Sequence, residues 1–148
     1  MNAAAPAAPD RWEPGSAIVL IGPPASGKST WTAARFPSSA RVALDFYRGL
    51  LTDDETNQHA TREALEVRAL ILEGRLRRGL TTVCDSTSIE PAARADLLTR
   101  ARAHRRPAAA VLFTTPLDEC LSRNAMRSRP VPPHVVRDMH ARLPTPPS

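Results

Sequence analysis

The sequence predicts an α/β fold in which a parallel sheet of about four strands is flanked by helices. Short apolar runs alternate along the chain with longer segments of helical character. Strands that alternate with helices form parallel sheets covered on both faces, and such strands are apolar without interruption. Three of the apolar runs are also followed by loops rich in polar residues. Because parallel strands place their carboxyl ends at one edge of the sheet, these loops are expected to meet there.

The first predicted strand is the apolar run Ala17–Ile21, which has the pattern of a strand buried on both faces. A helix is expected from Lys28 to about Arg35, because Pro37 stops it. The short run Arg41–Leu44 follows as a second strand that ends at Asp45. This first third of the chain therefore predicts a strand, a helix and a second strand.

A long helix is expected from about Gln58 to Arg78, ended by Gly79. Three acidic residues, at 53–55, precede it and are expected at its beginning, where negative charge suits the helix dipole. One apolar stripe at spacings of four, three and four residues is expected to face the sheet: Leu65, Ala69, Leu72 and Leu76.

The second half repeats the alternation of strands and helices. We expect a third strand over Leu80–Cys84, and Ser88 is a candidate cap for the helix that Pro91 opens. The remaining predicted elements are that helix to about His104, a strand over Ala108–Phe113, a helix from about Leu117 to Arg127, and a last helix ending near Leu143.

Length and composition indicate one domain. The chain of 148 residues is expected to form a single domain over residues 15–143, between Pro-rich tails at 1–14 and 144–148 that are expected to be disordered. No apolar run reaches the roughly 20 residues that a membrane helix needs, and the start does not resemble a signal peptide. We therefore expect a cytoplasmic protein without a membrane partner, in which Cys84 and Cys120 are reduced and packed as small apolar residues.

The basic residues are distributed in an informative way. The formal net charge of +5 suits an anionic partner, although an arginine-rich composition gives the same charge. Of the 20 Lys and Arg residues, Lys28 is the only lysine. A compact ammonium group on a flexible stem is what phosphate chemistry requires at one special position.

That lysine lies in a segment that matches G-x-x-x-x-G-K-[ST], after a predicted strand and at the start of a predicted helix. In such a phosphate-binding loop, backbone N–H groups and the helix N-terminus point at phosphate oxygens. The pattern predicts a P-loop NTPase fold that binds ATP, with Lys28 at the β- and γ-phosphates and Ser29 as a Mg²⁺ ligand. The predicted nucleotide-binding residues are Gly22, Pro23, Pro24, Ala25, Ser26, Gly27, Lys28, Ser29 and Thr30.

Asp45 and Arg48 follow the second predicted strand. A carboxylate there can accept the proton of an acceptor hydroxyl, and Arg48 can hold an acceptor phosphate or orient Asp45. A surface ion pair at the start of a helix explains the same spacing equally well.

Asp85 and two arginines complete the candidate site. Asp85 ends the third predicted strand, where an aspartate can hold Mg²⁺ through water or position a neighbouring group. Arg123 and Arg127 are four residues apart and are expected to share a helix face. Arginines on a mobile lid commonly neutralise the charge of a transferring phosphoryl group, but spacing alone favours a solvated basic face.

The segments Gly22–Ser29 and Asp45–Gln58 resemble the kinase module of bacterial polynucleotide kinase-phosphatases, and the similarity runs from about Ser16 to Leu143. The resemblance implies that the aspartate of the D-x-x-R motif, Asp45, is the general base and that Arg48 holds the acceptor end. It also implies a D-x-T-[NS] motif at 85–88 and a lid with the pattern R-N-x-x-R at 123–127.

The chain departs from that family in two respects. Leu44 stands where a small hydroxyl residue is usual, and no fifth strand is expected, so the sheet should end on its fourth strand. Three interpretations follow: an ATP- and Mg²⁺-dependent kinase of polynucleotide 5′-hydroxyl ends, a kinase of small hydroxylated molecules, or a nucleotide-binding module without turnover. A dinucleotide-binding domain fits poorly, because no G-x-G-x-x-G follows the first strand.

Overall fold

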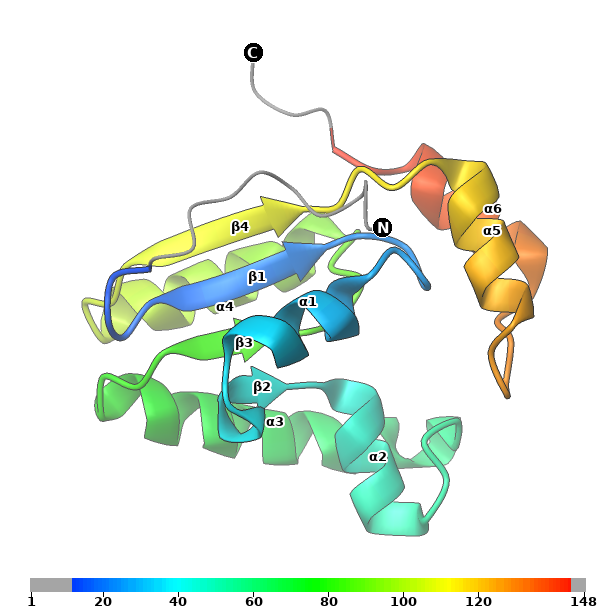
Figure 1. The fold of residues 1–148 in the computed structure, drawn as a ribbon. Helices are drawn as coiled ribbons and strands as arrows, with labels where there is room; N and C mark the ends of the chain where they lie inside the picture. The colour runs from blue at the N-terminus through cyan, green and yellow to red at the C-terminus, as the bar shows by residue number, and fades with distance from the viewer. Residues whose placement is uncertain (1–11, 145–148) are drawn as a thin grey trace.

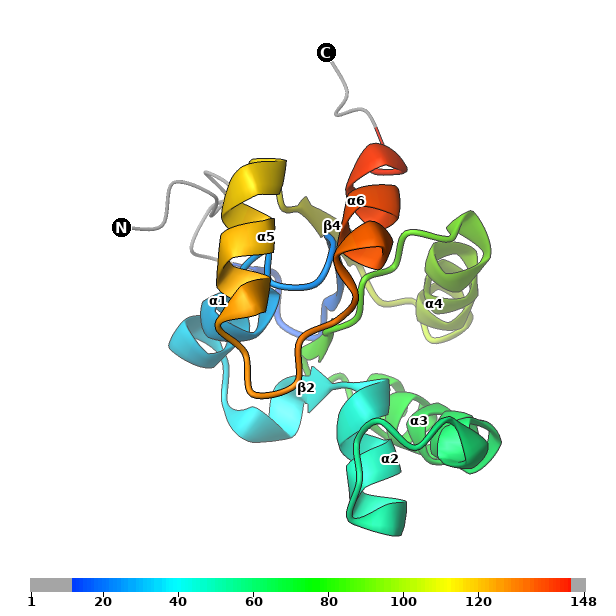
Figure 2. The ribbon, with the colours of Figure 1, turned by 90° about the vertical axis from the view of Figure 1, so that its right-hand side faces the viewer.

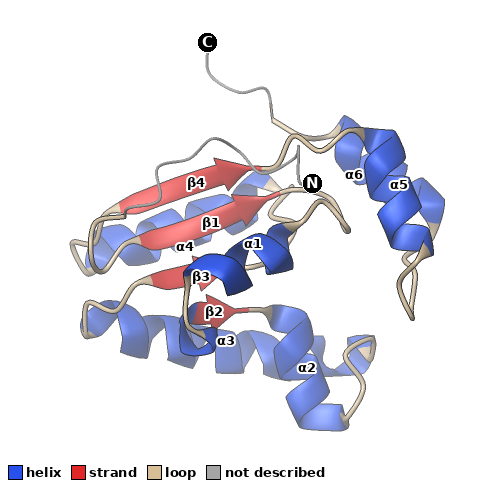
Figure 3. Cartoon of the chain, in the orientation of Figure 1, coloured by secondary structure: helices blue, strands red, loops and turns tan. Residues whose placement is uncertain are grey.

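The computed structural model describes residues 12–144, and its centre is a parallel sheet (Figures 1 and 3). The strand order is β2-β3-β1-β4, so each inner strand has neighbours that are distant in the sequence. Every pair is parallel, as the alternation of strands and helices predicts. The strands are β1 (Ala17–Ile21), β2 (Arg41–Val42), β3 (Thr82–Cys84) and β4 (Ala108–Leu112).

Helices cover both faces of this sheet. Figure 1 shows α1 in front of the sheet and α3 and α4 behind it, while α5 and α6 lie beyond the carboxyl ends of β1 and β4. Figure 2 shows these last two helices side by side. The helices are α1 (Lys28–Arg35), α2 (Leu44–Thr52), α3 (Thr61–Arg77), α4 (Pro91–Ala103), α5 (Leu117–Ala125) and α6 (Pro133–Ala141), with short 3-10 turns η1 (Ser38–Ala40) and η2 (Gln58–Ala60).

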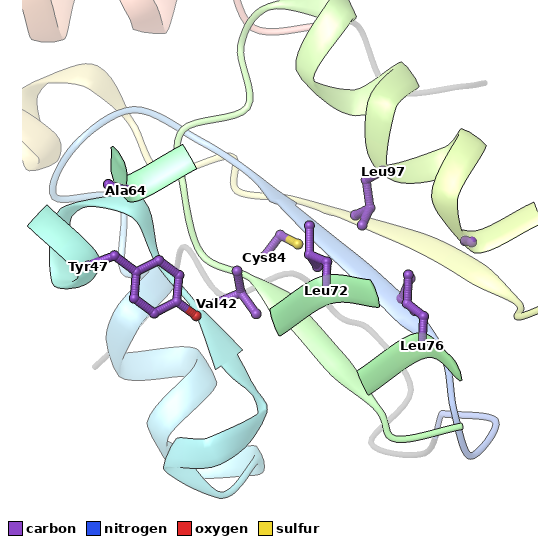
Figure 4. Close-up of a cluster of buried hydrophobic side chains, with 9 residues drawn as sticks. Val42, Tyr47, Ala64, Leu72, Leu76, Cys84 and Leu97 are labelled. Carbon is purple, nitrogen blue, oxygen red and sulfur yellow. The ribbon is translucent and has the colours of Figure 1, made fainter. Parts of the chain in front are cut away.

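The alternation of side chains along β1 divides the core into two parts. Ile18 and Leu20 face α1 and pack with the buried Trp31 and Phe113. Ala17 faces the opposite way, into a cluster with α3 and α4 that Figure 4 shows around Cys84: Val42, Tyr47, Ala64, Leu72, Leu76 and Leu97. Burial on both faces is why the β1 sequence contains no alternating polar positions.

The beginning of the second strand region differs from its prediction. Residues 41–44 were expected to be extended, but β2 stops at Val42 and α2 begins at Leu44. Asp45 therefore lies in the first helical turn rather than at a strand end. The acidic residues at 53–55 follow α2, with Asp53 as its C-cap at φ 61°, and so they are not at the beginning of the long helix.

The long helix also differs in the face that it buries. Leu72 and Leu76 are fully buried as predicted, but Leu65 is 45% exposed, and Ala64 is the buried residue of that turn. The prediction for the end of the helix is confirmed: Gly79 N–H bonds Leu76 O, and Leu80 N–H bonds Arg75 O. These two bonds are those of a Schellman motif.

Two smaller predictions in the second half are corrected. The N-cap of α4 is Glu90 and no side chain caps the helix, because Ser88 has φ 51° and its hydroxyl bonds that of Ser86 instead. Helix α5 ends at Ala125, so Arg127 lies just beyond the helix that was expected to contain it.

The beginning of the described region packs on the core. The tails predicted at 1–14 and 144–148 lie mostly outside the described residues, but Trp12 packs its ring edge-on against Trp31, at 6.1 Å between centroids. None of the helices between residues 12 and 144 is long and apolar enough to cross a membrane. The described residues thus form an α/β domain with a four-stranded parallel sheet and two helices beyond its carboxyl edge.

Candidate active site

A cavity of about 790 Å³ lies at the carboxyl edge of the sheet. Its walls come from the loop after β1, the start of α2, the loop after β3 and the segment around the end of α5. Five cationic side chains and two carboxylates line it. These charged residues are Lys28, Arg41, Arg48, Arg123 and Arg127 with Asp45 and Asp85.

The phosphate loop has the backbone that its sequence predicts. Gly27 is the N-cap of α1 at φ 103°, a conformation that residues with a Cβ rarely adopt. Gly22 is needed for close approach, since a Cβ there would lie 2.6 Å from Ser26 Oγ and 3.0 Å from Phe113 Cβ. The loop is also braced from outside by the Thr115 hydroxyl, which donates to Ser26 O at 2.7 Å.

Two loop positions cannot act through their amides. Pro23 and Pro24 have no N–H group, so the amides available to a phosphate begin at Ala25. Pro24 lines the cavity together with Ala25, Gly27, Lys28, Ser29 and Thr30, whereas Gly22, Pro23 and Ser26 lie behind this surface.

Lys28 is buried against its own loop. Its ammonium donates to Gly22 O at 2.9 Å and to Pro23 O at 2.8 Å, and lies 3.5 Å from Ser26 Oγ. Burial lowers its pKa from 10.5 to about 8, and the charge of Asp85 opposes this effect. A polyphosphate in the cavity would give this cation the counter-charge that the loop carbonyls provide only in part.

Ser29, Asp85 and Arg41 form a chain of contacts across three elements. The Ser29 hydroxyl donates to Asp85 Oδ2 at 3.0 Å, and Arg41 Nε donates to the same oxygen at 2.7 Å. The side chain of Asp85 is only 3% exposed, and that of Arg41 is 30% exposed. The carboxylate is therefore held at the bottom of the cavity by one hydroxyl and one guanidinium.

This donor set fits a magnesium ion bound together with a nucleotide. Mg²⁺ usually takes one or two protein oxygens and completes its shell with phosphate oxygens and water. Ser29 and Asp85 present a hydroxyl and a carboxylate within hydrogen-bond distance of each other. Within residues 12–144, no group of three His, Cys, Asp or Glu residues is placed to hold a metal alone.

Asp45 and Arg48 lie on the α2 side of the cavity. Asp45 is half-buried, and its Oδ1 accepts the Phe46 N–H at 2.8 Å, at the positive end of the helix dipole. Arg48 Nε donates to Glu55 O at 2.9 Å. No ion pair joins Asp45 to Arg48, although the structure describes both side chains. The alternative explanation of their spacing, a surface ion pair between Asp45 and Arg48, is therefore not what the structure shows.

The segment after α5, which was predicted to belong to a lid, is held by Asn124, which is 2% exposed. Its amide donates to Val131 O at 2.7 Å, and its Oδ1 accepts the Val131 N–H at 3.0 Å. These two bonds close the loop that carries Arg127 and Arg129. Arg129 forms an ion pair of 2.9 Å with Asp54, from the segment after α2, so the two sides of the cavity are in contact.

The two predicted lid arginines differ in their partners. Arg123 Nη2 pairs with Glu119 at 2.5 Å along α5, while the Arg127 side chain makes no hydrogen bond or ion pair to any residue within 12–144. Both line the cavity with the predicted residues Asp45, Arg48 and Asp85. Sequence reasoning missed Arg41 and Asn124. The only signal for Arg41 was a charge at the start of a buried apolar strand.

Fold and site together define a P-loop nucleotide-binding protein. The family model for the AAA domain matches residues 18–146, so the chain belongs to this family. No curated protein matches the chain.

Two solved chains have the same fold. One, in the "Structure of the Pnkp1/Rnl/Hen1 RNA repair complex", has a TM-score of 0.75 at 18% identity and covers 86% of this chain. Another, in the "Structure of Pnkp1/Rnl/Hen1 complex", has a TM-score of 0.64 at 19% identity and covers 77% of this chain. The matches span 43% and 40% of those longer chains. At this identity the likeness establishes the fold alone.

Proposed function

We propose that the protein is an ATP-dependent kinase that transfers the γ-phosphoryl group of ATP to the 5′-hydroxyl end of a polynucleotide. The observation that carries this proposal is the pairing of two walls around one cavity. Lys28 and Ser29 stand on the phosphate-loop side, and Asp45 and Arg48 stand on the α2 side. One wall suits a triphosphate and the other suits a hydroxyl next to a phosphate.

The residues can be given roles in one displacement step. The acceptor oxygen attacks the γ-phosphorus, its proton passes to a free oxygen of Asp45, and the bond from phosphorus to the bridging oxygen of ADP breaks. Lys28 and the amides of the cavity-lining loop residues, Ala25 and Gly27 to Thr30, hold the phosphates. Mg²⁺ held by Ser29 and Asp85 would neutralise phosphate charge. Arg123 and Arg127 are suited to the charge on the transferring group.

The positive charge of the cavity favours a polyanionic acceptor such as a nucleic acid. A small-molecule acceptor would instead be favoured by an enclosed apolar pocket. The cavity lining carries five cations against two carboxylates. A triphosphate on the phosphate-loop side leaves Arg48 on the α2 side for another phosphate, such as the one on the 3′ side of the first nucleoside. One of the two solved chains belongs to an RNA repair complex, which agrees with a nucleic acid acceptor.

The test is transfer from γ-labelled ATP to a 5′-hydroxyl oligonucleotide in Mg²⁺, with wild type beside Asp45→Asn and Lys28→Ala. Loss of a general base usually lowers the rate by about 10²- to 10⁴-fold, so Asp45→Asn should lose at least about a hundredfold. Asp53→Asn is a matched control, because Asp53 is exposed at a positive φ that asparagine adopts readily. Its activity should equal that of wild type.

Failure of the oligonucleotide to accept phosphate would leave two alternatives for the function. If wild type binds ATP but leaves the oligonucleotide unlabelled, the proposal fails. A screen of small hydroxylated acceptors would then separate a small-molecule kinase from a nucleotide-binding module without turnover.

A further inference from the structure

Arg41 is fixed at Asp85 by the sheet itself. It is the first residue of β2 and pairs in register with Val83 of β3, two residues before Asp85. The backbone continues this alignment, because Asp85 N–H donates to Val42 O at 2.9 Å. The guanidinium is thus delivered to the carboxylate by strand pairing rather than by a flexible loop.

The contact with Arg41 engages Asp85, the carboxylate that is also a candidate Mg²⁺ ligand. Asp85 Oδ2 already accepts the Ser29 hydroxyl at 3.0 Å and takes Arg41 Nε at 2.7 Å. With the Asp85 side chain 3% exposed, a bare negative charge there would be costly, and Arg41 compensates it. A divalent cation at Ser29 and Asp85 would offer the same compensation, so the two cations have overlapping roles.

We propose that Arg41 is an internal counter-ion of Asp85 that competes with Mg²⁺ for this carboxylate and thereby sets the Mg²⁺ concentration that the site requires. The inference rests on the metal role given to Ser29 and Asp85 in the proposed function. Arg41 is in this sense a positioning residue, since it acts on the site through Asp85.

Removal of Arg41 should destabilise the metal-free protein but favour the state with Mg²⁺ bound. Without a metal, Asp85 keeps only the hydroxyl bond and loses the cation in direct contact with it, although the charge of Lys28 remains nearby, so the empty protein loses stability. With Mg²⁺ bound, the metal compensates the charge and is no longer repelled by a guanidinium a few ångströms away. Even at the dielectric constant of water, the repulsion between a guanidinium and a divalent ion about 6 Å apart corresponds to about a tenfold change in affinity.

The experiment compares wild type, Arg41→Gln and a control in which an equally exposed ion-paired arginine is changed. Arg100, on α4, is suitable: its side chain is 28% exposed and pairs with Glu73 of α3 at 2.8 Å and with Asp96 of α4 at 3.1 Å. None of these three residues lines the cavity. Mg²⁺ is titrated against a fixed concentration of a fluorescent ADP analogue, and thermal unfolding is measured in EDTA and in Mg²⁺ with ADP.

Arg41→Gln should reach half-maximal nucleotide binding at about tenfold lower Mg²⁺ than wild type, and Mg²⁺ with ADP should raise its Tm by more than that of wild type. Arg100→Gln should have a lower Tm than wild type, but its half-maximal nucleotide binding should require the same Mg²⁺ concentration as that of wild type. Arg41→Lys, which keeps the charge, provides a second test if Arg41→Gln does not fold, and its midpoint should stay within about threefold of wild type.

An unchanged Mg²⁺ midpoint in Arg41→Gln, or a higher one, would overturn the inference. A midpoint that shifts in Arg41→Lys as far as in Arg41→Gln would do the same, because charge would not be the cause. If the midpoint shifts as expected but no phosphate reaches an oligonucleotide, the inference stands and the proposed acceptor is wrong. If nucleotide binding by wild type does not depend on Mg²⁺, the inference fails, and the transfer assay decides the proposed function separately.

Discussion

Replacing Lys28 with methionine should change how the stability of the protein depends on pH. The ammonium of Lys28 is buried against the carbonyl groups of Gly22 and Pro23, and burial lowers its pKa from 10.5 to about 8. The folded chain therefore binds fewer protons than the unfolded chain between these two values. Stability rises with pH wherever the unfolded state binds more protons, so wild type should gain stability as pH rises through this window.

The magnitude follows from the same two pKa values. Raising the pH from about 7.5 to 9.5 should stabilise the wild type by about 2 kcal/mol relative to Lys28→Met. The comparison with Lys28→Met is essential, because burial also raises the pKa of Cys84 to about 11. Because the pKa of Cys84 is higher in the folded than in the unfolded chain, stability falls as the pH rises above the pKa of the thiol in the unfolded chain. This loss is common to wild type and Lys28→Met, so it cancels in the comparison.

The assay is urea unfolding of both proteins at several pH values, without nucleotide. Nucleotide affinity of the wild type should fall over the same pH range, because the empty protein loses the charge that holds the phosphates. If the unfolding free energies of the two proteins run parallel to within about 0.5 kcal/mol from pH 7.5 to 9.5, Lys28 does not have the lowered pKa that its burial implies.

Two further predictions concern the loops that shape the cavity. Gly22→Ala places a Cβ 2.6 Å from Ser26 Oγ and 3.0 Å from Phe113 Cβ, so the loop must shift. The affinity for ATP, measured by calorimetry, should fall at least about tenfold. An unchanged affinity would contradict the requirement for glycine at this position. Asn124→Ala removes both bonds to Val131 and should destabilise the protein by about 1–3 kcal/mol in urea. Because the loop that carries Arg127 is then no longer closed, the rate of transfer should fall more than ATP affinity.

Local signals were sufficient for the elements that place the phosphate loop. The prediction of a strand over Ala17–Ile21 and of a helix over Lys28–Arg35 agrees with the structure at both ends. An uninterrupted apolar run, a glycine before the lysine and a proline two residues after the helix are all local determinants. The G-x-x-x-x-G-K-[ST] pattern likewise depends only on the loop itself.

Contacts that depend on register could not be predicted in this way. The pairing of Arg41 with Asp85 requires that β2 and β3 be neighbours with Arg41 opposite Val83, which no short window of sequence specifies. The error at Leu65 has a similar cause, since the position of α2 against α3 decides which side of the helix is buried. The early end of the second strand reflects helix formation from Leu44, in a segment whose apolar residues suit either structure.

The position of the transferred phosphate decides whether the protein is a kinase of polynucleotide 5′-hydroxyl ends. Wild-type protein would be incubated with γ-labelled ATP, Mg²⁺ and an oligonucleotide with a 5′-hydroxyl and a blocked 3′ end, and the product would be digested to mononucleotides. All label should be recovered in the 5′-phosphorylated first nucleotide, and an oligonucleotide already phosphorylated at its 5′ end should take none. Label elsewhere, or none in a protein that binds ATP, would contradict the proposed function.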